Sequence, residues 1–454
     1  MSASERPWAG RRIHFVGVGG AGMSGYARAA RALGAEVSGS DSAASSYLER
    51  LAADGILRAS VGHAPGNVPP GDGVEVIYSS AVPVENLERA AARERSLRER
   101  PRAELLSELT ALRRTIAVAG THGKTTTASM LVAALRAAGL SPGWLVGGSV
   151  AADLPNAEWG SGDWLIVEAD ESDRSMLSLS VEIAVLTNVE LDHHSTFGSL
   201  GELREAFREF LSAPRHAVVW DRPELVELRA GDVTPYDALG LDLTAGGSCF
   251  TWRDRRVCLG VPGSHNAVNA AGALEAARLA GAGAEAAIAG LAGFRGAGRR
   301  FQLLGKTAQG ALVYDDYAHH PTEVAATLDA ARTLAPRRLI AVFQPHLYTR
   351  TALLAREFGV ALARADVVAV LDVYPARERA EEHPGVSGLT IAEAAADAAG
   401  GRPVYWLATF AEAEPVLRGL LQGEDLCLLM GAGDVDELGH SLVSDLSVAG
   451  GGTP

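Results

Sequence analysis

The chain has 454 residues, 47% of them hydrophobic, and a formal net charge of −14 at neutral pH. This length predicts about three domains of ordinary size. An acidic chain is a poor binder of nucleic acid or of an anionic membrane surface. No run of residues is apolar and long enough to span a bilayer, and the N-terminal residues lack the apolar centre of a signal peptide. These features predict a cytoplasmic α/β protein.

The three cysteines, Cys249, Cys258 and Cys427, are scattered, and no C-x-x-C pair occurs. This usage argues against a disulfide scaffold or a structural zinc site. It fits a reducing compartment.

The N-terminal region alternates between strand and helix patterns. Residues 12–18 form a short apolar run, a helical stretch continues to Leu33, and residues 35–41 and 74–82 have the composition of strands. Such alternation predicts a parallel sheet. The charged segment 87–109 is predicted to be helical, broken near Pro101 and largely solvated, and to end at a domain boundary near residue 114.

A glycine pattern follows the first predicted strand. Gly17, Gly19 and Gly22 fit G-x-G-x-x-G, and Asp41 ends the next strand about twenty residues later. This pattern is typical of a loop that binds a pyrophosphate. It fits a nucleotide diphosphate as well as a dinucleotide.

Residues 118–128, VAGTHGKTTTA, lie between a predicted strand at 115–120 and a predicted helix at 126–139. Gly123, Lys124 and Thr125 fit the end of the phosphate-loop pattern G-x-x-x-x-G-K-[ST], but Val118 stands where the first glycine belongs. The strand–turn–helix context favours phosphate binding over a simple packing turn. Lys124 is one of only two lysines, with Lys306, in a chain that otherwise uses arginine. A compact ammonium is therefore expected to have a specific role there.

Two later apolar segments, 164–173 and 184–194, end in polar clusters that contain Glu168 and His193. Ligands gather at the carboxyl ends of parallel strands, and Mg²⁺ prefers hard oxygen ligands. The two residues are candidates for a metal site beside the phosphate. The alternatives are a helix cap or exposed strand end for Glu168 and an ordinary polar residue for His193.

A further boundary is expected near residues 298–306. Four strand-then-polar segments follow it, at 311–321, 338–346, 366–375 and 425–434. They predict a third α/β unit. The expected domains are therefore 1–114, 115–304 and 305–454.

In chain order, the motifs HFVGVGGAGMSG, AGTHGKTTT, EADESD, TNVELDHH, SHNAVNA, GRRF, DDYAHHPTE, FQPHLYTRT and MGAGD resemble those of the Mur ligases of peptidoglycan precursor synthesis. AGTHGKTTT is similar to the short phosphate loop that Mur and folylpolyglutamate ligases share. The resemblance implies three domains: a Rossmann-like UDP-binding domain, a P-loop ATPase-like central domain and a Rossmann-like C-terminal domain. The combination of motifs is closest to the alanine-adding members.

The resemblance implies an ATP-dependent ligase of cell-wall biogenesis, and hence of cell shape and division. It would join L-alanine to the lactyl carboxylate of UDP-N-acetylmuramate through an acyl phosphate, with ATP and Mg²⁺ or Mn²⁺, as a monomer or homodimer. Three alternatives stay open. They are a ligase that recycles a whole tripeptide, an NAD-dependent oxidoreductase based on the N-terminal glycines, and a non-catalytic UDP-sugar binder.

The resemblance also implies roles for individual residues. Those implied to bind ATP are Gly120, Thr121, His122, Gly123, Lys124, Thr125, Thr126, Asn266, Asn269, Arg300 and Asp316. Those implied to bind the UDP-sugar are Gly19, Gly20, Ala21, Gly22, Met23, Ser24, Asp41, His63, Ser79 and Ser80. Lys124, Glu168 and His193 are the implied catalytic residues, Thr125, Glu168 and His193 the metal-site residues, and Tyr317, His346 and Arg350 the residues near the amino acid.

Several of these residues have simpler explanations. Asn269 could be a polar residue near a helix N-terminus, Arg300 could form a surface ion pair, and His319 and His320 could cap a helix before Pro321. One position departs from the family pattern, because Leu347 stands where the family usually has an arginine near the amino-acid carboxylate. Leucine cannot grip a carboxylate as an arginine fork does. We hypothesise that Arg350, helped by Arg377, binds the alanine carboxylate alone.

Overall fold

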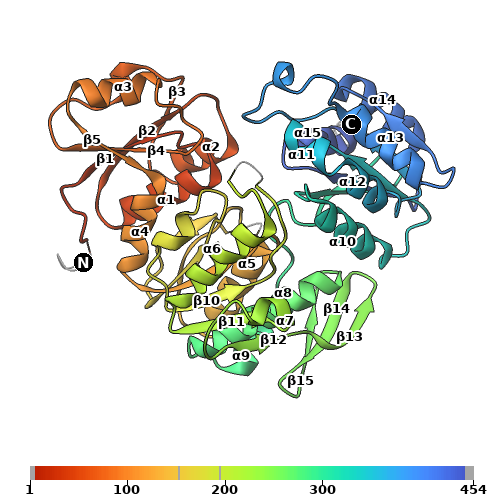
Figure 1. The fold of residues 1–454 in the computed structure, drawn as a ribbon, viewed down its shortest axis with the longest axis horizontal. Coiled ribbons are helices and arrows are strands. Elements are labelled where there is room, and N and C mark those ends of the chain that lie inside the picture. The colour runs from red at the N-terminus through yellow and green to blue at the C-terminus, as the bar shows by residue number, and fades with distance from the viewer. Residues whose placement is uncertain (1–5, 152–153, 194–195, 445–454) are drawn as a thin grey trace, which may run out of the picture. The chain divides into compact units, whose positions relative to one another are not determined.

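The computed structural model describes residues 6–151, 154–193 and 196–444. These residues form four β-sheets in two compact units (Figure 1). The first unit comprises residues 1–237 and 268–294, and the second comprises 238–267 and 295–454. None of the described helices is long and apolar enough to cross a bilayer.

The first sheet of the first unit is parallel and has five strands. In spatial order these are β3 (Ser60–Val61), β2 (Glu36–Asp41), β1 (Arg12–Val16), β4 (Val74–Tyr78) and β5 (Arg98–Pro101). The helices of this region are α1 (Ala21–Ala32), α2 (Ser46–Ala53), α3 (Leu87–Glu94) and α4 (Arg102–Ala111), with a 3₁₀ turn η2 (Pro65–Asn67). The order 3-2-1-4-5 is that of a nucleotide-binding half-fold, with its ligand edge at the carboxyl ends of the strands.

The charged segment 87–109 was predicted as a broken, solvated helix, and this was wrong in two respects. Strand β5 separates α3 from α4 and pairs in parallel with β4. Several of its charged side chains are buried, where they form ion pairs within the segment and with residues outside it. Arg100 is 4% exposed, and its guanidinium contacts Glu75, Glu104 and Glu108. Local charge density did not reveal these partners, one of which lies 25 residues away.

The second sheet of the first unit contains the predicted phosphate-loop strand. Its spatial order is β12 (Thr234–Tyr236), β11 (His216–Trp220), β10 (Ile183–Leu186), β6 (Arg114–Ala119), β9 (Trp164–Glu168), β7 (Gly143–Leu145) and β8 (Ala157–Glu158). All pairs are parallel except β7–β8. Its helices are α5 (Lys124–Ala137), α6 (Leu200–Ser212), α7 (Pro223–Val226), α8 (Ser264–Leu279) and α9 (Ala284–Ala292), with a 3₁₀ turn η3 (Ser175–Ser178).

The centre of this sheet is apolar on both faces. Residues 116–119 of β6 and 183–186 of β10 are fully buried, as parallel strands covered on both faces require. The apolar parts of the segments predicted at 115–120, 164–173 and 184–194 are confirmed as strands β6, β9 and β10. Residue 194 lies outside the described residues. Glu168 is the last residue of β9, so its carboxyl group lies at the predicted ligand edge.

The second unit contains a six-stranded sheet. Its order is β16 (Gln302–Lys306), β17 (Leu312–Asp316), β21 (Leu426–Met430), β18 (Leu339–Phe343), β19 (Val367–Val370) and β20 (Val404–Trp406). The helices are α10 (Pro321–Arg332), α11 (Tyr348–Leu353), α12 (Ala355–Leu362), α13 (Gly388–Ala398), α14 (Phe410–Leu420) and α15 (Val435–Val443), with a 3₁₀ turn η4 (Ala380–Glu382). Only β16 is antiparallel to its neighbour. Alternate residues of β18 enter separate clusters, Phe343 in one and Val342 in the other, so helices cover both faces.

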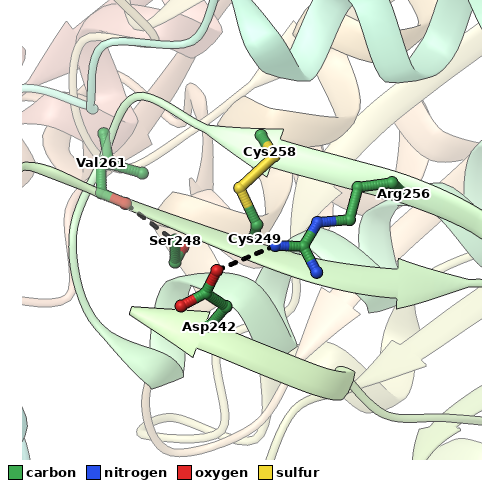
Figure 2. The surroundings of a disulfide bond; sticks show 6 residues. All are labelled: Asp242, Ser248, Cys249, Arg256, Cys258 and Val261. Carbon is green, nitrogen blue, oxygen red and sulfur yellow. Dashed lines mark hydrogen bonds and ion pairs between the residues drawn. A yellow bond between two sulfur atoms is a disulfide. The ribbon is translucent and has the colours of Figure 1, made fainter. Parts of the chain in front are cut away.

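A small antiparallel sheet, not anticipated from the sequence, consists of β13 (Leu239–Thr244), β14 (Gly247–Trp252) and β15 (Arg255–Leu259). It corrects the expectation from the cysteines. Cys249 and Cys258 are directly opposite each other on β14 and β15, 4.1 Å apart at Cα, and form a disulfide (Figure 2). The cysteines looked scattered, yet a tight hairpin brings residues nine positions apart into register. The third cysteine, Cys427, is buried in β21, and burial raises its thiol pKa to about 12.

This arrangement predicts a thiol count that depends on denaturation and reduction. The native protein should react with no thiol reagent at neutral pH, because Cys427 is buried and stays protonated. Denaturation without reductant should expose one thiol, and denaturation with reductant should expose all three cysteines. A colorimetric thiol titration measures each state. Three thiols without reductant would show that Cys249 and Cys258 do not pair.

Candidate active site

The shortened phosphate loop between β6 and α5 depends on two glycines. Gly120 has φ +129°, and a Cβ added there would lie 2.1 Å from the hydroxyl oxygen of Thr187. Gly123 has φ +81°, and its Cβ would lie 2.7 Å from the side-chain oxygen of Asn269. No larger side chain fits either position without displacing a neighbour. The loop is therefore a turn pressed against β10 and α8, and Val118 belongs to the strand before it.

Residues after β10 hold the loop by hydrogen bonds. The backbone N–H of His122 donates to the side-chain oxygen of Asn188 at 2.8 Å, and the Thr187 hydroxyl donates to the His122 carbonyl at 2.6 Å. The backbone N–H of Thr121 donates to the Asn188 carbonyl at 3.2 Å. Gly123, the residue before α5, offers no side-chain cap. The first N–H groups of α5 are thus available for an anion.

Lys124, the first residue of α5, points back over the loop. Its Nζ donates to the Gly120 carbonyl at 2.5 Å and to the two carboxylate oxygens of Glu171 at 2.9 and 3.0 Å. Glu171 is fully buried. Burial alone would lower the Lys124 pKa, but the charges of Glu171 and Asp170 outweigh it and raise that pKa. The ammonium is therefore firmly protonated.

The residues predicted for a metal lie around this lysine. The Thr125 hydroxyl donates to Glu168 at 3.1 Å. His193 Nε2 lies 3.3 Å from the carboxylate of Glu171, the same group that binds Lys124. His193 has φ +53°, a conformation uncommon outside glycine. A hydroxyl and a carboxylate oxygen in contact at a strand end fit the hard-oxygen preference of Mg²⁺.

The N-terminal glycine loop is built in a similar way. The Gly19 N–H donates to Asp41 at 2.7 Å, and a Cβ at Gly17 would meet the side chain of Ser79 at 3.1 Å. Gly20, the residue before α1, has no side-chain cap hydrogen bond, so the first N–H groups of this helix also suit an anion. Asp41 at the end of β2 therefore positions the loop.

The other predicted UDP-sugar residues divide into two groups. Gly20 and Ser80 are exposed, and Ala21, Gly22, His63 and Ser79 are partly exposed. Met23 and Ser24 lie in the core, and the Ser24 hydroxyl donates to the Ala21 carbonyl and contacts the Asn156 amide. The side chains of Met23 and Ser24 thus pack the start of α1, while the first group lies at the ligand edge.

The two predicted asparagines lie three residues apart on α8, on one face of that helix. Asn269 packs against Gly123, as described above. Asn266 donates to the Pro262 carbonyl at 2.7 Å.

In the second unit, Asp316 accepts from the backbone N–H groups of Phe301 and Ala318 at 2.7 and 2.8 Å. Burial raises its pKa to about 6, although the nearby Arg300 charge acts in the opposite direction. Arg300 also stacks on the Tyr317 ring at 4.9 Å. His320 caps α10, with its ring accepting from the Thr322 N–H, which confirms the capping explanation.

The residues predicted near the amino acid form an aromatic cluster in this unit. Tyr317 packs edge-on against His319, His319 against His346, and His346 stacks on Tyr374, with ring centroids 5.4 to 6.0 Å apart. Arg350 is 4% exposed, and its guanidinium contacts His346 Nδ1 at 3.1 Å. The structure thus brings Tyr317, His346 and Arg350 into one cluster.

Leu347 lies between His346 and α11 in a strained conformation. Its φ is +71° and its ψ is 134°, a combination that favours glycine. Its N–H donates to the Tyr374 carbonyl and its carbonyl accepts from Thr351, and these bonds hold it in place. Leu347, which departs from the family pattern, is therefore held in one backbone conformation three residues before Arg350.

Two site residues were missed in the sequence. Glu171 binds both Lys124 and His193, and Arg102 donates to Asp170 and Asp173 at 3.0 and 2.9 Å. The motif EADESD, in which three carboxylates follow Glu168 closely, was the available signal for Glu171. Nothing local marked Arg102, which lies 68 residues before its partner Asp170.

The comparisons with known proteins identify the family. Residues 12–114 match the Mur ligase family, catalytic domain, residues 118–277 the Mur ligase middle domain, and residues 299–433 the Mur ligase, glutamate ligase domain. The chain belongs to the Mur ligase family. The predicted three-domain α/β architecture is confirmed, while the boundaries at 114 and 304 stay predictions.

Two relatives and one solved structure make the similarity more specific. The chain is 43% identical to the UDP-N-acetylmuramate–L-alanine ligase of Thermobifida fusca, over 96% of each chain. It is 44% identical to the ligase of the same name from Rubrobacter xylanophilus, over 96% of this chain and all of that one. The crystal structure of UDP-N-acetylmuramate-alanine ligase from Thermotoga maritima matches with a TM-score of 0.83 at 26% identity, over 96% of this chain and 99% of that chain.

The buried Lys124–Glu171 pair predicts how stability responds to nucleotide. Glu171→Gln leaves the lysine charge without its partner, which should lower the free energy of unfolding by about 3 kcal/mol in the absence of ligand. ADP should then raise the melting temperature more in this variant than in the wild type, because a phosphate replaces the lost charge. Thermal melts with and without ADP and Mg²⁺ measure both effects.

The matched control is Glu182→Gln, which breaks an exposed ion pair with Arg114. Its effect should stay below about 1 kcal/mol, with an ADP response like that of the wild type. Equal melting temperatures for Glu171→Gln and the wild type would contradict the inferred pairing.

Proposed function

We propose that this protein is an ATP-dependent ligase that joins L-alanine to the lactyl carboxylate of UDP-N-acetylmuramate, in peptidoglycan precursor synthesis. The observation that carries the proposal is the convergence of Lys124, Thr125, Glu168 and His193 on one edge of the central sheet. The relatives supply the substrates, because two proteins more than 40% identical over their length bear the name of this ligase.

The chemistry requires stabilisation of negative charge at two successive centres. ATP phosphorylates the lactyl carboxylate, and ADP leaves. The amino group of alanine then attacks the acyl phosphate, and the tetrahedral intermediate loses phosphate. In both steps positive charge and N–H donors lower the barrier. Lys124 and the first N–H groups of α5 supply them on the ATP side.

Mg²⁺ fits the same edge. Thr125 and Glu168 would hold it, with His193 oriented nearby by Glu171. When bound, it would neutralise phosphate charge. Mn²⁺ would suit the same residues, since both ions accept oxygen ligands.

The UDP-sugar would bind at the carboxyl edge of the N-terminal sheet. The loop from Gly17 to Gly22 and the start of α1 suit its diphosphate. We place the alanine near Tyr317, His346 and Arg350, with Arg350 as the partner of its carboxylate. Asn266, Asn269, Arg300 and Asp316 are proposed for the nucleoside and phosphates of ATP.

A tripeptide-recycling ligase is the second candidate. The crystal structure of a murein peptide ligase from Psychrobacter arcticus shares the fold, with a TM-score of 0.71 at 24% identity. This likeness concerns the fold alone. The higher identity to the alanine ligases favours alanine.

ADP release tests the function and the phosphate loop together. Release should require UDP-N-acetylmuramate and L-alanine in addition to ATP and Mg²⁺, and it should be highest with alanine in a panel of amino acids and the tripeptide. Lys124→Arg should abolish it although the charge is kept, because a planar guanidinium cannot replace an ammonium between the Gly120 carbonyl and Glu171. The control Lys306→Arg, at an exposed position, should be fully active.

Either of two results would refute this proposal. ATP turnover that ignores the UDP-sugar, or reduction of NAD, would exclude the ligase. Near-normal ligation by Lys124→Arg would show that the loop works in another way.

The strained Leu347 yields a separate prediction for alanine binding. In Leu347→Arg a second guanidinium could reach the alanine carboxylate, so the KM for alanine should fall by roughly tenfold, which corresponds to about 1.4 kcal/mol. The KM for ATP should not change. Steady-state kinetics at saturating ATP and UDP-sugar measure this, and an unchanged alanine KM would reject the idea that Arg350 binds the carboxylate alone.

A further inference from the structure

A fully buried carboxylate connects three elements below the predicted UDP-sugar edge. Glu88, near the start of α3, accepts hydrogen bonds from His14 of β1 at 2.9 Å and from the Ser40 hydroxyl of β2 at 2.6 Å. Its other oxygen accepts from the Asn67 amide at 2.7 Å and from the Ala64 N–H at 3.2 Å. Both belong to the loop that follows β3. The carboxylate therefore fixes this loop to the centre of the sheet.

Glu88 remains an anion in this position. Burial alone would raise its pKa, but hydrogen bonds from His14, Ser40 and Asn67 lower it to about 2. A carboxylate at neutral pH can only accept hydrogen bonds. Each of its neighbours must therefore donate.

This requirement determines which ring nitrogen of His63, a residue of the same loop, carries a proton. The single hydroxyl proton of Ser40 goes to Glu88, so Ser40 Oγ can only accept from the His63 Nδ1 that lies 3.1 Å away. The other neighbour of Nδ1 is Glu88 itself, at 3.4 Å, which also accepts. Nδ1 must carry a proton. In the neutral ring, Nε2 is then an acceptor.

Within the described part of the chain, the hydrogen-bond partners of the His63 ring lie at Nδ1 and none lies at Nε2. His63 comes two residues after β3, whose Val61 pairs with Asp41 at the end of β2. Asp41 in turn binds the Gly19 N–H of the glycine loop. His63 thus follows a strand end at the carboxyl edge of the sheet, where the UDP-sugar is proposed to bind.

We propose that Glu88 is a positioning residue for the UDP-sugar, which holds His63 so that its Nε2 accepts a hydrogen bond from the nucleoside. An acceptor nitrogen matches an N–H or O–H group, so its partner is the uracil imide N–H or a ribose hydroxyl. The diphosphate, which carries no proton at neutral pH, does not match. The inference depends on the proposed UDP-sugar specificity.

UDP alone is the probe, because its binding needs no catalysis. Isothermal titration of the full chain should give a dissociation constant for UDP that rises about tenfold in His63→Ala and in Glu88→Gln, as the loss of one buried hydrogen bond predicts. The double variant should be no weaker than His63→Ala, because both changes remove the same contact. In turnover, KM for the UDP-sugar should rise while kcat and the KM for ATP stay within about twofold.

The control is Glu75→Gln, a carboxylate of the same sheet near the amino end of β4 that pairs with Arg11 and Arg100. It should bind UDP like the wild type. Should Glu88→Gln not fold, Ser40→Ala removes the acceptor for His63 and should weaken UDP to a similar degree.

Substrate analogues identify the group that His63 contacts. The analogues are UDP with an N3-methylated uracil, a 2′-deoxyribose or a 3′-deoxyribose. The one that lacks the contacted donor should lose about tenfold in affinity for the wild type and nothing further in His63→Ala. If every analogue loses the same factor in both proteins, or if Glu88→Gln and His63→Ala bind UDP normally, the inference is wrong. Failure of the wild type to bind UDP at all would instead refute the proposed function.

Discussion

The close approach of Gly120 to the residues that follow β10 is the constraint on which the loop between β6 and α5 depends. The backbone of Gly120 lies so near Thr187 and Asn188 that a single methyl group would collide with them. This contact lets the loop turn in fewer residues than the common phosphate loop. It also ties the loop to the segment that follows β10 and leads to His193, so the residues proposed for phosphate and for metal lie on connected segments.

The charged side chains around Lys124 already form ion pairs with one another in the absence of ligand. Glu171 lies between Lys124 and His193, and Arg102 contacts the two aspartates beside it. Such pairing avoids isolated charges in a partly buried site, which would be costly. In the proposed reaction, a phosphate that binds Lys124 would compete with Glu171, so binding would exchange one anion for another.

The sequence predicted the parts of the fold that depend on local pattern. The strands β6, β9, β10 and the four later apolar runs were visible because strands buried on both faces are continuously apolar. The positions of Lys124 and Thr125 at a strand–helix junction, and of Glu168 at a strand end, could be predicted from the local pattern. In the same way, the order of motifs along the chain predicted the family that the relatives then confirmed.

What could not be predicted depends on partners that are distant in sequence. The local sequence of β5 predicts helix, and the segment is a strand because it pairs with β4. From the sequence, Arg102 and Glu88 resemble ordinary surface charges. In the structure Arg102 pairs with Asp170 and Asp173, and Glu88 pairs with His14. The cystine pair required knowledge of a hairpin register, which its polar strand sequence leaves weakly defined. Sequence patterns indicate which apolar segments are buried, but they do not indicate which charged side chains form pairs.

The protonated state of Lys124 has a consequence for chemoselectivity. In the proposed reaction an acyl phosphate forms close to this side chain, and acyl phosphates react with any amine that has a free lone pair. The Glu171 and Asp170 carboxylates keep the Lys124 amine protonated, so it has no lone pair to offer. Lys306 is the only other lysine in the sequence. The enzyme thus carries few side-chain amines that could capture the activated sugar acid in place of the incoming amino acid.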